Sequence, residues 1–309
     1  MSLLVLATSP IVEAQLAALR RIAPDEVIET DAERARPADV EAIFAFKLPP
    51  GLCARFPRLR FVAGAGAGVD ELLADGDIPA DIPVTRSVDP AQARRMAQYV
   101  ALCVLRWHRE LQRYEAQQRE RAWSRRVPDV ESLWSVGLMG FGVLGTVVAE
   151  ALHPLGYPLR AWTRTPRQHG LVTCFAGPEK LAAFLAGTRV LICLLPLTAD
   201  TRALLAAPLF ARLPRGAYVV NVARGALLDE RDLMAALDSG QLAGAALDVY
   251  AHEPLPADSP LWSDARILAT PHIAAIPDPE AAARQVLENL ARARNGAPLR
   301  HVVERARAY

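Results

Sequence analysis

The sequence predicts an α/β protein of two domains, each built on a doubly wound parallel sheet. Short apolar runs alternate with amphipathic helical stretches along nearly the whole chain, as βαβ units require. The 309 residues exceed the size of one typical core and suit two domains. A glycine-rich turn at Gly140–Gly145 also lies between an apolar run and an amphipathic helix, where such a sheet would place it.

The first third of the chain alternates four expected strands with helical stretches. The strands are the apolar runs at residues 3–7, 40–46, 59–65 and 82–85. Residues 11–22 have apolar side chains at helical spacing, which predicts an amphipathic helix. A longer helix is expected from Pro90 to about Arg119, because proline is tolerated in a first helical turn and an apolar stripe follows it. This helix is the expected link between the domains.

A second series of strands and helices follows. Its strands are expected at residues 135–139, 159–163, 190–194, 218–222, 245–249 and 267–269, with helices at 178–185 and 230–239. The series is complete before one last helix, which begins after Pro277 and runs to about Arg294. We expect this helix to return to the first domain. One domain would then comprise residues 1–98 and 276–309, and the other residues 99–275.

The glycine-rich turn has the spacing of a dinucleotide-binding site. Gly140 allows the tight turn, Gly142 lets the backbone approach a pyrophosphate, and Gly145 lets the helix pack closely on the strand. Val143 and Leu144 begin that helix, whose N–H groups and positive dipole end face the phosphates. Glycine-rich turns also occur by chance, but the flanking strand and helix favour a nicotinamide cofactor.

The chain lacks the acidic residue that usually binds the adenosine ribose of NAD. No Asp or Glu occurs between Glu150 and Glu179, the stretch in which the strand at 159–163 ends. That strand end instead carries hydroxyl and guanidinium groups, on Thr163, Arg164, Thr165 and Arg167. Because both groups suit a 2′-phosphate dianion, we predict NADP(H) as the preferred cofactor, with Arg164 and Arg167 at the phosphate. NAD(H) binding and an ordinary solvated basic loop are the alternatives.

Three polar residues, Arg224, Glu253 and His272, each follow a predicted strand of the second series. The carboxyl ends of parallel strands line the ligand crevice of an open α/β sheet, so these side chains are expected near one site. A guanidinium can hold a 2-oxo acid, an imidazolium can protonate its carbonyl oxygen, and a carboxylate can orient the imidazole. We therefore predict Arg224, Glu253 and His272 as catalytic residues, although each alone has an ordinary structural explanation.

The other histidines lack this pattern. His252 is the competing histidine, but its neighbour Glu253 is better explained as the partner that orients His272. The remaining histidines are expected to be non-catalytic: His108, His153, His169 and His301.

Together these segments resemble a known family. Those that resemble the D-isomer-specific 2-hydroxyacid dehydrogenases are residues 140–145, 221–225, 248–254 and 271–275. Those most similar to the glyoxylate/hydroxypyruvate reductase A branch of that family are residues 141–145, 162–165, 253–262 and 304–309. We therefore predict two Rossmann-like domains, one a flavodoxin-like substrate (catalytic) domain and the other NAD(P)-binding.

The resemblance also implies roles for individual residues. Arg224, Glu253 and His272 correspond to the family's triad, and the backbone N–H groups of Ala67 and Gly68 would hold the substrate carboxylate. The residues that would line the cofactor are Leu195, Pro196, Val222, Asp248 and Ala274. A homodimer built around the helix at 90–119 is implied as well.

One position departs from the branch. Its members carry a Trp shortly before a Pro-Pro loop, where this chain has Lys47. A cation there could contact the substrate carboxylate or a second acidic group, so Lys47 is a candidate substrate-binding residue. The implied reaction is reduction of glyoxylate to glycolate and of hydroxypyruvate to D-glycerate. The alternatives are another D-2-hydroxyacid dehydrogenase, such as a phosphoglycerate type, and a non-catalytic dinucleotide-sensing protein.

Composition argues against several other classes. The formal net charge of +1 does not favour a nucleic-acid partner, and no apolar run approaches the length of a membrane span. The apolar start at residues 1–7 is short and lacks a basic region, so it is better explained as a strand than as a signal peptide. The four cysteines lack metal-ligand spacing, so we expect no metal site, and reduced thiols in the cytoplasm.

Overall fold

The computed structural model describes residues 1–74, 78–127 and 129–305, and the chain divides into two compact units. The first unit comprises Met1–Gln92 and Ile276–Tyr309, and the second comprises Ala93–Ala275. The boundaries predicted from the sequence are 98/99 and 275/276, whereas this division falls at 92/93 and 275/276. Of the branch-like ending predicted at 304–309, residues 306–309 lie outside the described residues.

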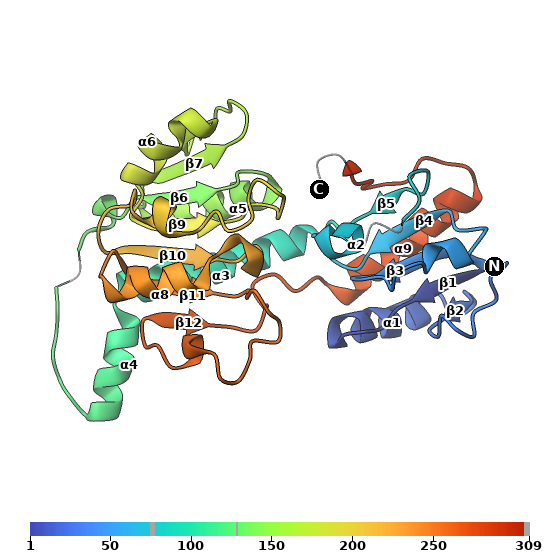
Figure 1. The fold of residues 1–309 in the computed structure, drawn as a ribbon, viewed down its shortest axis with the longest axis horizontal. Helices are drawn as coiled ribbons and strands as arrows, with labels where there is room; N and C mark the ends of the chain where they lie inside the picture. Colours follow the sequence, from blue (N-terminus) through green and yellow to red (C-terminus); the bar gives the residue numbers. More distant parts are fainter. Residues whose placement is uncertain (75–77, 128, 306–309) are drawn as a thin grey trace. The chain divides into compact units, whose positions relative to one another are not determined.

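The first unit is built on a sheet with the order β2-β1-β3-β4-β5, in which every neighbouring pair is parallel. Its strands are β1 (Ser2–Val5), β2 (Ile28–Glu29), β3 (Val40–Ala45), β4 (Phe61–Gly64) and β5 (Val84–Thr85). Helices α1 (Pro10–Ile22) and α9 (Pro279–Arg294) pack side by side on one face, and α2 (Asp70–Ala74) packs on the other (Figure 1). Leu3 and Val5 point to the first face and Leu4 to the second, as strand alternation requires.

Both long helices on this sheet begin at side-chain caps. The Ser9 hydroxyl accepts the N–H of Val12 at the start of α1, and the Asp278 carboxylate accepts the N–H groups of Glu280 and Ala281 at the start of α9. In each helix a proline follows the cap, where its missing N–H costs nothing. The last helix of the chain thus packs on the sheet that the first strand opens.

The second unit contains a sheet with the order β12-β11-β10-β9-β6-β7-β8, again with every neighbouring pair parallel. Its strands are β6 (Val136–Met139), β7 (Leu159–Thr163), β8 (Thr173–Ala176), β9 (Val190–Cys193), β10 (Ala217–Asn221), β11 (Leu242–Leu247) and β12 (Ile267–Ala269). The helices after the domain boundary are α3 (Pro90–His108, from Ala93 on), α4 (Leu111–Glu120), α5 (Val143–Leu152), α6 (Leu181–Ala186), α7 (Ala207–Phe210) and α8 (Glu230–Asp238). Both sheets are parallel and flanked by helices, which confirms the predicted fold class.

Two apolar clusters cover the two faces of this second sheet. Side chains of α3 and α5 pack on one face, and side chains of α6, α7 and α8 pack on the other. Neighbouring residues of one strand join different clusters: Val220 belongs to the first and Val219 to the second. Strands buried on both faces explain why the sequence reads as near-continuous apolar runs there.

Short 3-10 helices connect the elements of both units. They are η1 (Cys53–Arg55), η2 (Glu131–Leu133), η3 (His153–Leu155), η4 (Pro178–Lys180), η5 (Gly225–Leu227) and η6 (Pro260–Trp262).

The long helix predicted over residues 90–119 is wrong as one element. The structure breaks it at Glu110, whose φ of 52° lies in the left-handed region, so that α3 ends at His108 and α4 begins at Leu111. None of the residues of α4 is buried, whereas Val100 and Val104 of α3 are fully buried. The apolar stripe therefore holds only α3 on the sheet, and α4 is free to take another direction.

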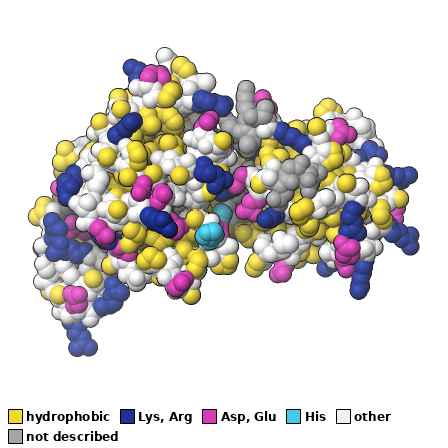
Figure 2. All heavy atoms as spheres, in the orientation of Figure 1, with side chains coloured by type: hydrophobic (Ala, Val, Ile, Leu, Met, Phe, Trp, Pro, Cys, Tyr) yellow, Lys and Arg dark blue, Asp and Glu magenta, His cyan; other side chains and the backbone are white. Residues whose placement is uncertain are grey.

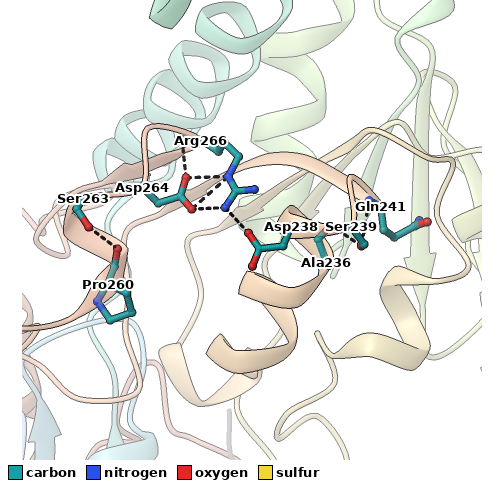
Figure 3. Close-up of polar contacts among 8 residues, drawn as sticks. All are labelled: Ala236, Asp238, Ser239, Gln241, Pro260, Ser263, Asp264 and Arg266. Atoms are coloured by element: carbon teal, nitrogen blue, oxygen red, sulfur yellow. Dashed lines mark hydrogen bonds and ion pairs between the residues drawn. The ribbon is translucent and has the colours of Figure 1, made fainter.

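A cluster of charges ties β12 to α8. The guanidinium of Arg266 donates to both carboxylate oxygens of Asp264 and, at 2.8 Å, to Asp238 at the end of α8 (Figure 3). Arg266 is about one third exposed, so solvent screening limits the stabilisation to about 1 kcal/mol. The cluster holds the start of the edge strand β12 in place. Thr270 and His272 follow the other end of this strand.

The surface carries charge of both signs. Figure 2 shows acidic and basic side chains interspersed with apolar ones over the visible face, in keeping with the net charge of +1. Among the described residues, no helix combines the length and the apolar character that crossing a membrane requires.

Candidate active site

Arg224, Glu253 and His272 follow three neighbouring strands of the second sheet. Arg224 lies three residues beyond β10, and Glu253 and His272 follow β11 and β12. These strands are adjacent and parallel, so their carboxyl ends share one edge of the sheet. The connections that carry the three predicted residues therefore leave the sheet on the same side.

His272 and Glu253 form a hydrogen-bonded pair. His272 Nδ1 lies 2.8 Å from Glu253 Oε2, and the other carboxylate oxygen accepts the N–H of Tyr250 at 3.0 Å. The hydrogen bond to Glu253 raises the pKa of His272 above its ordinary 6.5, against the opposing effect of burial. Burial alone would raise the pKa of Glu253, but the hydrogen bonds from His272 and Tyr250 lower it overall. The pair therefore favours an imidazolium next to a carboxylate. Half of the His272 side-chain surface is exposed to solvent, so a ligand can reach the ring.

Asn221 shapes the turn that presents Arg224. Its fully buried side chain donates from Nδ2 to the carbonyl of Arg224 at 3.0 Å and accepts the N–H of Ala223 on Oδ1 at 3.2 Å. The guanidinium of Arg224 donates to the Ala223 carbonyl at 2.7 Å. Its positive charge acts on both His272 and Glu253, lowering the pKa of each. The cation thus lies within electrostatic reach of the pair, as a site for a carboxylate or carbonyl requires.

Asp248 and Ala274, both predicted to line a cofactor, are joined to each other. The Asp248 carboxylate is buried and accepts the N–H groups of Ile273 and Ala274, each at 2.8 Å. Asp248 therefore anchors the turn that carries His272. The sequence carries no signal for this anchoring role, nor for that of Asn221, because no motif marks which backbone N–H a carboxylate or amide will reach.

The glycine-rich turn fits a dinucleotide. Gly140 has a φ of 99°, and a Cβ there would lie 2.8 Å from the Leu194 carbonyl oxygen. A Cβ at Gly145 would lie 2.5 Å from the Gly140 carbonyl oxygen, whereas nothing lies within 4 Å of a Cβ at Gly142. Gly140 and Gly145 are thus demanded by the protein's own backbone, and the space before Gly142 at the start of α5 is open for a pyrophosphate.

The residues predicted to bind the 2′-phosphate lie at and after the end of β7, and their side chains have different surroundings. Arg164 lines a cavity of about 480 Å³, together with Glu179, Lys180 and residues around β8. Thr163 Oγ1 donates to the Thr165 carbonyl at 2.8 Å. Arg167 instead donates to the carbonyl of Phe141 within the glycine-rich turn, and its guanidinium carbon lies 5.5 Å from the centre of the Phe141 ring. Arg164 is therefore the arginine that borders a cavity, and Arg167 is the one that packs on the glycine-rich turn.

The other predicted cofactor residues lie along the same edge of the sheet. Leu195 and Pro196 follow β9, and the backbone N of Leu195 would lie 3.2 Å from a Cβ at Gly140. Val222 directly follows β10 and is buried. Val143, at the start of α5, has 70% of its surface exposed. No group of three or more His, Cys, Asp or Glu side chains within the described ranges could hold a metal ion.

The predicted substrate-carboxylate residues lie in the first unit. Ala67 and Gly68 belong to the loop that follows β4, and Lys47 is exposed just beyond β3. The carbonyl of Ala65 accepts Nε2 of the buried Gln15, and the carbonyl of Gly66 accepts the N–H of Ser87. The start of the loop is therefore tied down, as an anion site made of backbone N–H groups requires.

Comparison with known proteins agrees with the geometry. Residues 101–274 match the family described as D-isomer specific 2-hydroxyacid dehydrogenase, NAD binding domain. The chain is 43% identical over 260 residues to glyoxylate/hydroxypyruvate reductase A of Yersinia enterocolitica, covering 82% of each chain. It is 41% identical over 279 residues to the protein of the same name from Klebsiella pneumoniae, covering 89% of this chain and 88% of that one.

The chain belongs to the D-isomer-specific 2-hydroxyacid dehydrogenase family. The predicted resemblance is thereby confirmed.

Solved structures of family members have the same fold. A D-isomer specific 2-hydroxyacid dehydrogenase from Xanthobacter autotrophicus Py2, in complex with NADPH and MES, matches with a TM-score of 0.92 and 41% identity over 100% of this chain and 99% of that one. An NADPH-dependent glyoxylate/hydroxypyruvate reductase from Sinorhizobium meliloti, in complex with NADP and sulfate, matches with a TM-score of 0.92 and 34% identity over 100% of both chains.

Proposed function

We propose that this family member is an NADPH-dependent reductase of small 2-oxo acids, acting on glyoxylate and hydroxypyruvate. The observation that carries the proposal is the His272–Glu253 pair beside Arg224, at the sheet edge that also carries the glycine-rich turn. It supplies a proton donor and a carboxylate-binding cation next to a place for a dinucleotide. The names of the relatives from Yersinia enterocolitica and Sinorhizobium meliloti support the substrates and the cofactor.

In the proposed reaction the carbonyl at C2 becomes a hydroxyl group. NADPH, when bound, supplies the hydride that forms the new C–H bond at C2. His272 gives the proton from Nε2 to the carbonyl oxygen and is left neutral, and Glu253 holds Nδ1–H so that Nε2 is directed to the substrate. Arg224 pairs with the carboxylate and carbonyl oxygens, which it can contact in both the ground and the transition state.

The first unit would serve as the substrate domain and the second as the NAD(P)-binding domain. Backbone N–H groups of Ala67 and Gly68 would hold the substrate carboxylate, and Lys47 would add a second cation. In the second unit, Arg164 would recognise the 2′-phosphate, with Thr163 and Thr165 beside it. The absence of any acidic residue between Glu150 and Glu179 supports NADP(H) over NAD(H).

We also propose a homodimer in the cytoplasm. Large apolar side chains are exposed along one segment that includes α3 and α4: Leu102 55%, Leu105 36%, Leu111 46%, Trp123 92%, Val127 93%, Val130 57% and Leu133 60%. Exposed apolar side chains gathered in one segment are typical of an interface, and a second copy of the chain would bury them. The four cysteines are free thiols, which suits a reducing compartment.

The test is NADPH oxidation by the purified protein with glyoxylate and with hydroxypyruvate, repeated with NADH. Turnover that favours NADPH supports the proposal. Turnover with 3-phosphohydroxypyruvate alone would indicate a phosphoglycerate-type enzyme. Tight NADPH binding without turnover of any 2-oxo acid would indicate the dinucleotide-sensing alternative.

A further inference from the structure

The turn that carries His272 has a backbone conformation that needs support. His272 has a φ of 55°, in the left-handed region that residues with a side chain rarely adopt. Such a conformation persists only where the surrounding structure imposes it. The contacts that impose it here therefore also set the direction of the imidazole.

Asp248 supplies the first layer of that support. Its backbone carbonyl accepts the N–H of His272 at 2.8 Å, and its carboxylate accepts the N–H groups of Ile273 and Ala274. The hydroxyl of Thr270 contacts the same carboxylate, at 2.6 Å from Oδ1. Because Asp248 is only 1% exposed, no water competes for these donors. The whole turn from 270 to 274 is thus built around one buried carboxylate.

A tyrosine from another element completes the network. The hydroxyl of Tyr99, on α3, lies 2.5 Å from Thr270 Oγ1. Both carboxylate oxygens of Asp248 accept backbone N–H groups, and the Thr270 hydroxyl donates its one proton to Oδ1. Tyr99 must then be the donor to Thr270. Burial raises the pKa of Tyr99 well above 10, so this proton stays in place at any ordinary pH.

We propose that Tyr99 and Thr270 are positioning residues for His272, acting through the carboxylate of Asp248. The chain of contacts runs from Tyr99 to Thr270, then to Asp248 and back to the backbone on either side of His272. It begins on α3, where Val100 and Val104 are fully buried, so its starting point is packed into the core of the second unit. The inference rests on the proposed function, because it assigns the two hydroxyls to the geometry of its proton donor.

The primary test is Tyr99→Phe, which removes one hydroxyl and keeps the ring. We expect kcat for glyoxylate reduction to fall about tenfold or more, with KM changed by less than about twofold, because a misdirected donor slows proton transfer more than it weakens binding. The matched control is Tyr157→Phe. The Tyr157 hydroxyl bonds to His108 at 2.8 Å and belongs to the same unit, but it is not part of the network around Asp248. The control should retain wild-type kcat.

Thr270 gives a second test, which also decides if Tyr99→Phe does not fold. Thr270→Val keeps the shape and loses the hydroxyl, whereas Thr270→Ser keeps the hydroxyl. We expect kcat to fall about tenfold in the valine variant and to remain within about twofold of wild type in the serine variant. Wild-type kcat in the valine variant, or a larger loss in the serine variant than in the valine variant, would show that the hydroxyl does not carry the effect, and would overturn the proposal.

A readout without turnover separates this inference from the proposed function. The His272 ring can be titrated by NMR in the cofactor-free protein, with its signal assigned by His272→Gln. The charged groups that face this ring are Glu253, Arg224 and Asp248. If the turn loosens, the bond to Glu253 weakens, and the pKa of His272 should fall toward 6.5 in Tyr99→Phe but not in Tyr157→Phe.

The outcomes are distinct. An unchanged His272 titration in folded Tyr99→Phe, or an equal change in Tyr157→Phe, would overturn the positioning role. Wild-type protein without turnover of any 2-oxo acid would overturn the proposed function, while the titration would still decide the role of Tyr99.

Discussion

Gly225 and Tyr250 approach each other through their backbones. A Cβ on Gly225 would lie 1.8 Å from the carbonyl carbon of Tyr250 and 1.9 Å from its oxygen. The loops after β10 and β11 therefore touch main chain to main chain, and this contact brings the turn of Arg224 against the segment that leads to Glu253. Only glycine permits it.

Gly225→Ala should therefore damage both the fold and the site. A methyl group there must push the two loops apart, and overpacking of this kind costs roughly 1–3 kcal/mol. We expect a fall in Tm of at least about 2 °C, together with a loss of most reductase activity. Calorimetry and NADPH oxidation measure the two effects. Gly170→Ala is the control, since nothing lies within 4 Å of a Cβ there; equal losses in the two variants would contradict the argument.

The pH dependence of reduction should follow His272. Reduction consumes the imidazolium form, and Glu253 raises the pKa of His272 above 6.5. The rate should therefore be constant at low pH and fall as the pH rises through this raised pKa, whereas oxidation of a 2-hydroxy acid should show the opposite limb. Profiles of kcat against pH in both directions test this.

Glu253→Gln should shift the pH at which the rate of reduction begins to fall. A neutral amide cannot stabilise the imidazolium as a carboxylate does, so the pKa of His272 should fall and the alkaline loss of reduction should begin at lower pH. The variant's pH profile, compared with that of wild type, gives the result. A limb at the wild-type pH in Glu253→Gln would rule out Glu253 as the cause of the raised pKa.

Arg164→Ala should reduce cofactor affinity in a way that depends on the 2′-phosphate. A charge-assisted hydrogen bond contributes roughly 1.5–3 kcal/mol, so the Kd for 2′,5′-ADP should rise by at least about tenfold while that for 5′-AMP changes little. Isothermal titration calorimetry measures both. Arg212→Ala, an exposed arginine of the same unit, is the control for loss of positive charge. Equal weakening of both nucleotides by Arg164→Ala would remove Arg164 from the 2′-phosphate site.

Charged substitutions on the exposed apolar segment should dissociate the proposed dimer. Leu102 and Trp123 are 55% and 92% exposed, and a carboxylate at each would be costly to bury against a second copy. We expect Leu102→Glu combined with Trp123→Glu to shift the mass from dimer to monomer in sedimentation velocity. Val27→Glu, at a residue of the first unit that is 53% exposed, should remain dimeric. A wild-type monomer at micromolar concentration would disprove the dimer itself.

The features that sequence reasoning could reach are local. Strands buried on both faces are near-continuous apolar runs, and the close approach of Gly145 to the Gly140 carbonyl lies within one turn. The order of strands and helices then places Arg224, Glu253 and His272 after neighbouring strands, because parallel strands end at a common edge. Edge strands β2 and β8 were not predicted, because β2 has only two residues and Thr173, the first residue of β8, is polar and exposed.

The sequence by itself thus determined the α/β class, the dinucleotide turn and the three strand ends with chemical side chains, since each depends on spacing along the chain. Only the tertiary structure decided that α3 and α4 separate at Glu110, that Arg167 turns to the Phe141 carbonyl, and that Tyr99 reaches Thr270, 171 residues away. Hydrogen bonds between side chains of distant segments depend on the packing of whole elements, and no periodicity or motif records which donor will meet which acceptor.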